Sequence, residues 1–69
     1  MSPTTARLRA IAAALGYDAD AAVQAARNLD SRRLPEPSAK SCNQVVRGMM
    51  LETMWRSDPE KFRAVRATL

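Results

Sequence analysis

The acidic side chains best placed to share catalytic work are Asp18 and Asp20, two residues apart in "GYDADA". Paired carboxylates can act as general acid and base, and a histidine or cysteine nucleophile is the other common arrangement. The chain has no histidine, one cysteine and two glycines, too few for a glycine-rich phosphate loop. Because both aspartates precede an apolar helical repeat, helix capping is the better interpretation of the pair. We expect no enzyme activity, no cofactor and no small-molecule substrate.

Metal binding and redox chemistry are also poor fits. A structural zinc site takes four cysteine or histidine ligands, so we expect no metal, and we interpret Cys42 as a small buried hydrophobe. A single free cysteine suits a reducing compartment. The longest uncharged apolar run, residues 10–17, is shorter than the roughly 20 residues of a membrane span. We therefore expect a cytoplasmic protein that does not enter the membrane.

The segment "VVRGMMLETMW", residues 45–55, contains three of the four methionines and the only tryptophan. Flexible methionine surfaces adapt to differently shaped partners, and tryptophan and arginine often dominate binding energy. The segment predicts a protein-binding surface. The expected partner-binding residues, with two linker arginines added, are Arg47, Met50, Leu51, Met54, Trp55, Arg32 and Arg33.

The same segment is also the candidate for self-association. A chain of 69 residues has a small core that usually needs support from disulfides, metal or oligomerisation, and the first two are not expected here. We predict a homodimer in which a glycine permits close approach of two helices. The expected interface residues are Val45, Val46, Gly48 and Met49. The alternative is that Val46, Met49 and Met50 belong to the chain's own core, and the sequence does not decide which face is inside.

A DNA-binding helix-turn-helix is the alternative function. Residues 8–29 pair two apolar repeats around a turn glycine, as DNA-reading units of bacterial repressors do, and the net charge is +4. The acidic start of the second repeat would face phosphate, which counts against a small DNA-binding regulator of transcription. The residues that could contact DNA in this alternative are Gln24, Arg27, Asn28, Arg32 and Arg33.

Four helices must position these residues, over about 3–15, 19–30, 39–56 and 58–67. In the first, Leu8, Ile11, Ala12 and Leu15 follow a helical period, and Arg7 with Thr4 or Thr5 is expected to face outward. In the second, the expected apolar face is Ala22, Val23, Ala26 and Leu29. In the last, it is Phe62, Val65 and Leu69. The sequence predicts a single all-α domain over residues 1–69.

Local signals set the expected ends of the helices. Ser2, Asp18 or Asp20, and Ser38 or Ser41 are the expected N-caps of the first three helices. The sequence "SDPE" has the form of a capping box with Ser57 as cap and Glu60 as its partner. Two prolines predict an extended linker over about 31–38, in which Leu34 is expected to attach the segment to the core.

The whole chain resembles the small early proteins of temperate phages of GC-rich bacteria. It is similar in length, helical layout and the arginine- and alanine-rich style of "ARLRAIAAALG" and "AARNLDSRRL" to the quorum-sensing anti-activators of Mu-like Pseudomonas phages. The resemblance implies a helical homodimer that binds and inhibits a larger host protein. Such targets include a LuxR-type transcription activator and a pilus assembly ATPase. No binding residue is carried over from the resemblance by position.

Overall fold

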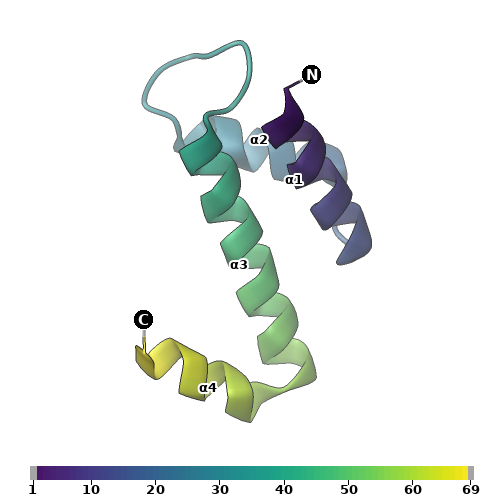
Figure 1. Cartoon of the computed structure of the whole chain (residues 1–69), viewed down its shortest axis with the longest axis vertical. Helices are drawn as coiled ribbons and strands as arrows, with labels where there is room; N and C mark the ends of the chain where they lie inside the picture. The colour runs from purple at the N-terminus through teal and green to yellow at the C-terminus, as the bar shows by residue number, and fades with distance from the viewer. Residues whose placement is uncertain (1, 69) are drawn as a thin grey trace.

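The computed structural model describes residues 2–68, and all of their regular structure is helical (Figure 1). The helices are α1 (Pro3–Ala14), α2 (Ala19–Leu29), α3 (Ala39–Ser57) and α4 (Pro59–Thr68). The prediction of an all-α chain with four helices is confirmed, with ends that lie within one residue or so of the expected ones.

The first three helices begin at side-chain caps. The Ser2 hydroxyl accepts a hydrogen bond from the amide of Thr5, and the Asp18 carboxylate accepts one from the amide of Asp20 at 3.0 Å. Ser38 caps α3 in the same way. Because these bonds satisfy amides that have no partner inside the helix, short local sequences were enough to place three helix starts.

The predicted cap of α4 was wrong. Ser57 is the last residue of α3, and its hydroxyl donates to the carbonyl of Thr53. The cap is Asp58, whose carboxylate accepts a hydrogen bond from the Lys61 amide at 3.1 Å. A residue before proline is disfavoured in the helical conformation, so the break falls on Asp58, which precedes Pro59, and α3 continues through Ser57.

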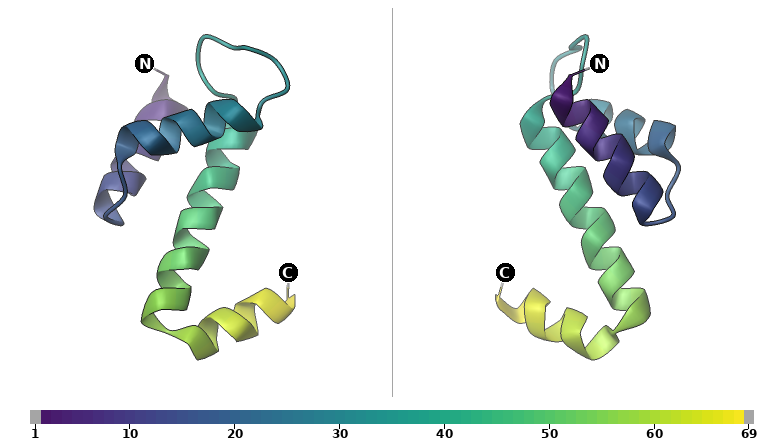
Figure 2. Two further views of the ribbon diagram at one scale, coloured as in Figure 1. Left: turned by 180° about the vertical axis from the view of Figure 1, so that it is seen from behind. Right: turned by 45° about the vertical axis from the view of Figure 1, so that its right-hand side comes forward.

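The core lies where α1 and α2 pack against the N-terminal half of α3 (Figures 1 and 2). Four of its eight buried members are alanine or cysteine on close-packed helix faces, and the full set is Leu8, Ala12, Ala22, Val23, Ala26, Cys42, Val46 and Met49. The predicted apolar face of α1 is confirmed, since Ile11 and Leu15 pack against this cluster. The predicted face of α2 is correct except for Leu29, which is 48% exposed because it lies in the last turn, beyond the core.

Of Thr4 and Thr5, one of which was expected to face outward with Arg7, Thr5 is buried. Its hydroxyl donates to the Glu36 carboxylate at 2.7 Å and lies 2.9 Å from the Ser2 hydroxyl. The hydrogen bond to Glu36 satisfies the polar atom that would otherwise oppose burial. It also lowers the pKa of Glu36. Thr5 therefore joins α1 to the connecting segment.

Polar contacts, more than Leu34, hold the segment between α2 and α3. Asp30 accepts hydrogen bonds from the Ser38 amide at 3.0 Å and from the Ser41 hydroxyl at 2.6 Å. Pro37 is buried, whereas Leu34 is only half-buried and is not part of the core cluster. The expected linker is confirmed as non-helical, but the expected role of Leu34 was wrong.

Helix α4 extends away from the three-helix unit (Figures 1 and 2). Among the described elements it packs against α3 alone, and none of its residues is buried. Phe62 and Val65 are half-buried against α3, and Leu69, expected on the same face, lies outside the described residues. No helix within residues 2–68 is long and apolar enough to cross a membrane.

Candidate partner-binding surface

The largest apolar side chains outside the core gather where α3 meets α4. This surface is called the α3–α4 corner and consists of Met50, Leu51, Met54, Trp55, Phe62 and Val65. Met50 and Trp55 are 50% and 54% exposed, and the other four residues are half-buried. From Met50 to Thr68 no residue is buried. The corner therefore carries two of the three exposed large hydrophobic side chains of the described residues and has no core of its own.

Helical spacing explains why α3 presents so wide an apolar surface at this end. Gly48, Leu51 and Trp55 follow one another at three and four residues, and so do Met50 and Met54 with Arg47 before them. Such positions stack on one side of a helix. Two neighbouring stripes of α3 therefore reach the corner, and α4 lies against them.

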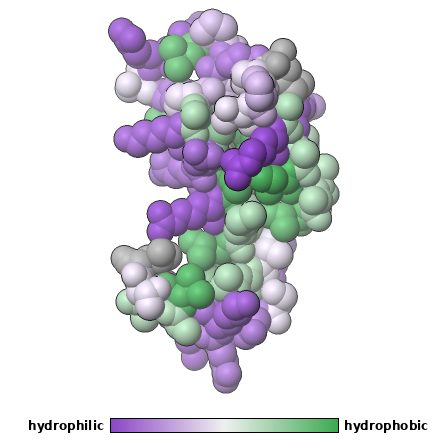
Figure 3. All heavy atoms as spheres, in the orientation of Figure 1, coloured by the Kyte–Doolittle hydropathy of each residue, from purple (hydrophilic) through white to green (hydrophobic). Residues whose placement is uncertain are grey.

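Two hollows flank this contact. One is lined by Gly48, Leu51, Glu52, Trp55, Phe62 and Arg66. The other lies between α1, α3 and α4 and is lined by Arg7, Asn43, Val46, Arg47, Met50, Leu51, Met54 and Val65. Leu51 belongs to both, so the two hollows are parts of one surface. Figure 3 shows hydrophobic residues gathered at this junction, with hydrophilic side chains above them.

The border of the corner is mainly basic. Arg7, Arg47 and Arg66 line the hollows, and Glu52 is the acidic residue among the lining side chains. Glu52 is paired with Arg56 at 2.7 Å, within α3. Arg7 donates a hydrogen bond to the Asn43 side chain at 3.1 Å, which fixes it near α3. The surface therefore combines apolar contact area with positive charge.

Five of the seven residues predicted to bind a partner lie together at this surface, namely Arg47, Met50, Leu51, Met54 and Trp55. Arg32 and Arg33 do not, because the connecting segment lies at the other end of α3 (Figure 1). Sequence reasoning missed Phe62, Val65, Arg7 and Arg66. The helical period of residues 58–67 marked Phe62 and Val65 as apolar, but it did not show which side of α3 they would meet.

The predicted dimer residues are divided by the fold. Val46 and Met49 are 6% and 7% exposed in the chain's own core. Val45 is half-buried against that core. Gly48 is exposed, and a Cβ added to it would have no neighbour within 4 Å. Of the four, Gly48 is the residue best placed to face a second molecule.

The residues named for DNA contact come together at a different place. Gln24, Arg27, Asn28, Arg32 and Arg33 all line a polar hollow at the end of α2, which Asp30 and Leu34 complete. Arg27 donates to the carbonyl of Pro35 at 3.0 Å, and the Gln24 amide donates to Asn28 at 3.3 Å. Part of the hydrogen-bonding capacity of this cluster is therefore used inside the chain.

The remaining candidates for chemistry have structural partners. Asp18 caps α2, and Asp20 pairs with Arg9 at 2.6 Å. Within residues 2–68 no three histidine, cysteine, aspartate or glutamate side chains lie close enough together to hold a metal ion. Cys42 is buried, and desolvation, with smaller contributions from Asp30 and Glu36, raises the pKa of its thiol. A neutral buried thiol is a poor nucleophile.

Comparison of the chain with known protein families, with curated proteins and with solved structures finds no match in any of the three. The function must therefore be inferred from the surfaces of the chain itself.

Proposed function

We propose that this protein is a non-enzymatic interaction module of the bacterial cytoplasm that binds and inhibits a larger host protein through the α3–α4 corner. The observation that carries the proposal is the set of six large apolar side chains at the corner, none of them buried. The phage resemblance suggests the kind of target: a transcription activator of quorum sensing or a pilus assembly ATPase. In that case the protein acts as an anti-activator.

The energetics favour such a surface as a binding site. Burial of apolar area contributes roughly 25 cal/mol per Å², and the corner side chains keep much of that area in contact with water. Tryptophan and arginine are enriched among residues that dominate binding, and Trp55 lies near Arg66 in the same hollow. Met50 and Met54 add side chains that adapt to the shape of a partner.

The test is capture of a host protein from nuclease-treated bacterial lysate by the tagged protein. Trp55→Ala should abolish capture while the chain stays folded, because Trp55 is half exposed and does not belong to the core cluster. Leu29→Ala is the matched control, since Leu29 is exposed to a similar extent on α2, away from the corner. Circular dichroism of both variants checks the fold.

Two outcomes would contradict the proposal. One is capture that Trp55→Ala leaves intact. The other is a Trp55→Ala chain that unfolds, which would mean that Trp55 is needed for the fold. In that second case Met50→Ser provides an independent test, because Met50 is exposed to a similar extent and is not a member of the core cluster.

DNA binding is the second candidate, favoured by one specific observation. All five residues named for DNA contact line the same hollow, although they come from both α2 and the connecting segment. Binding of a labelled duplex that weakens steeply as salt rises, and that Arg27→Ala or Gln24→Ala reduces, would support this candidate. Under it, Trp55→Ala should not change DNA affinity.

A further inference from the structure

We propose that the segment bound by the α3–α4 corner is an amphipathic helix of the partner, with an apolar end and an acidic end, lying alongside α3. The inference rests on the proposed function and specifies the chemistry of the partner. It follows from the continuity, the length and the charge of the surface along α3.

The surface is continuous beyond the corner. The hollow beside Met50 and Met54 shares Asn43 and Arg47 with a further hollow, towards the start of α3, that Lys40 and Gln44 complete. The two hollows of the corner share Leu51. Two hollows therefore adjoin along one side of α3 from Lys40 to Met54, and the third lies across the α4 contact from them.

The length of this surface fits a helix. Lys40 and Met54 are separated by 14 residues of helix, which at ~1.5 Å per residue is about 21 Å. A partner helix of about four turns covers that length. Helix-in-groove recognition uses apolar residues spaced at three and four positions as anchors, and these would meet Met50, Leu51 and Met54.

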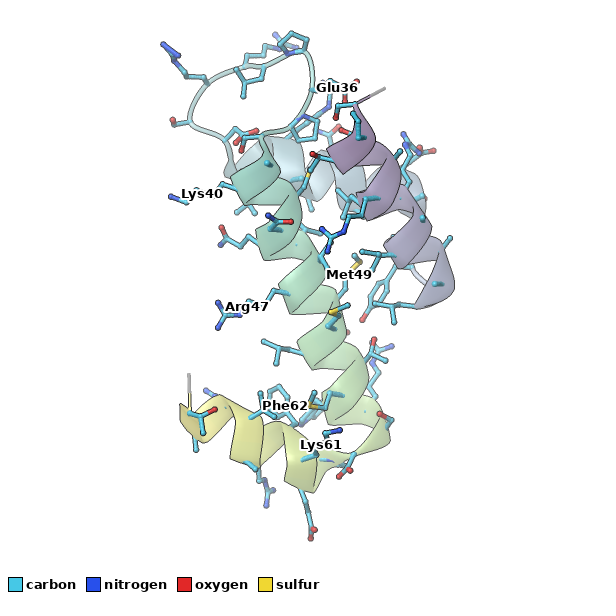
Figure 4. All side chains as sticks on the ribbon, viewed as in Figure 1. Glu36, Lys40, Arg47, Met49, Lys61 and Phe62 are labelled. Atoms are coloured by element: carbon cyan, nitrogen blue, oxygen red, sulfur yellow. The ribbon has the colours of Figure 1, made fainter. Side chains whose placement is uncertain are left out.

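The charge changes along the surface. At the corner the lining is apolar, whereas at the start of α3 it is basic, with Lys40 and Arg47 both exposed. Figure 4 shows these two side chains pointing away from α3 on the side towards which α4 folds back. No acidic residue is among the described side chains that line the hollow beside Met50 and Met54 or the further hollow towards the start of α3. Carboxylates at one end of the bound helix would complement them.

The same charges argue against a second copy of this chain as the occupant. In a two-fold dimer the same patch faces itself, so a patch that carries Arg7, Arg47 and Lys40 would face another patch with the same positive charges. An α4 from another copy would bring Lys61, Arg63 and Arg66 with only Glu60 as a counter-charge. Like charges in an interface oppose association, so the surface fits an acidic partner better.

The experiment uses a synthetic helical peptide of about four turns, without tryptophan, with leucines at helical spacing in one half and glutamates in the other. Trp55 is the only tryptophan of the full chain, so its fluorescence reports on binding directly. We expect a saturable change in Trp55 emission. A peptide with glutamine in place of every glutamate should bind about tenfold more weakly, and salt should reduce the difference.

Matched variants locate the acidic end of the peptide. The double variant Lys40→Gln/Arg47→Gln should weaken binding of the acidic peptide about tenfold. Arg32→Gln/Arg33→Gln removes the same charge from exposed positions of the connecting segment that line neither of the two hollows along α3 and should leave affinity within about twofold. Equal binding of the acidic and neutral peptides, or equal effects of the two double variants, would overturn the inference.

The inference and the proposed function can fail separately. If host-protein capture is lost with Trp55→Ala but is unchanged by Lys40→Gln/Arg47→Gln, the corner binds a partner, and the acidic character inferred for that partner is wrong. If capture does not depend on Trp55, the proposed function itself is wrong. A shift in Trp55 emission that follows dimerisation of the protein alone would identify a second copy as the occupant and also overturn the inference.

Discussion

At the scale of single residues, Asp30 connects the end of α2 to the start of α3. Its carboxylate accepts hydrogen bonds from the hydroxyl and amide of Ser38 and from the hydroxyl of Ser41. Ser38 in turn caps α3. These hydrogen bonds stabilise the charged carboxylate and lower the pKa of Asp30, with the Ser38 hydroxyl as the largest cause.

The lowered pKa of Asp30 predicts a specific pH dependence of stability. A carboxyl whose pKa is lower in the folded chain stabilises the fold above its unfolded pKa, about 3.9 for aspartate, and this contribution is lost as the pH falls through the folded pKa. Asp30→Asn should therefore lower the melting temperature at neutral pH, and the difference from the natural chain should shrink in acid. Thermal denaturation followed by circular dichroism over this pH range measures it. A difference in melting temperature between the variant and the natural chain that stays constant down to the lowest pH would contradict it.

At the scale of elements, α2 depends on small residues for its packing. Ala26 has no exposed surface and Ala22 is 6% exposed, whereas Ala25 on the same helix is exposed. Close packing leaves little space for added methyl groups. The alanines of α2 therefore allow close packing of the helices, but they bury little apolar area.

The close packing of α2 predicts a difference between two neighbouring substitutions. Ala26→Leu should lower the free energy of unfolding by about 1–3 kcal/mol, because a larger side chain forces the helices apart. Ala25→Leu makes the same chemical change on the exposed side and should shift it by no more than about 0.5 kcal/mol. Urea denaturation of the two variants measures both values. Similar losses in both would show that α2 is not packed through Ala26.

At the scale of the whole molecule, the residues that form the core and the residues proposed to bind a partner lie in different parts of the chain. The core lies in α1, α2 and the first half of α3, and the apolar surface without a core lies at the α3–α4 corner. The molecule measures 39 × 23 × 17 Å, and it is elongated in the direction that leads from the core to the α3–α4 corner. We therefore expect corner substitutions to change binding more than folding.

The homodimer expected from the sequence, which the charges around the α3–α4 corner do not favour, can be tested at this scale. Gly48→Ala should raise the stability of the isolated chain by up to about 1 kcal/mol, because an exposed glycine inside a helix is unfavourable and the new Cβ meets nothing within 4 Å. If Gly48 allows two copies to approach closely, the same variant should weaken the dimer. Light scattering at several concentrations, compared with twice the 7.6 kDa mass of the chain, measures this. A natural chain that stays monomeric throughout would show that the homodimer is wrong.

The sequence by itself determined the number, type and approximate ends of the helices. Caps such as Ser2, Asp18 and Ser38 act within a few residues, and the repeats that include Leu8 and Val23 follow a period that one helix sets alone. The error at Ser57 had a local cause as well. The residue immediately before Pro59 was the better site for the break.

Only the tertiary structure decided which side of α3 is inside. Val46 and Met49 meet α1 and α2, whereas Met50, the next residue after Met49, points to another side of α3, and Trp55 lies beyond the last core residue of the helix. The separation of Arg32 and Arg33 from the corner depends on the same geometry, since a helix of 19 residues carries its two ends far apart. Helical period gives the directions of side chains around one axis, but which directions are covered depends on how long the neighbouring helices are and where they end.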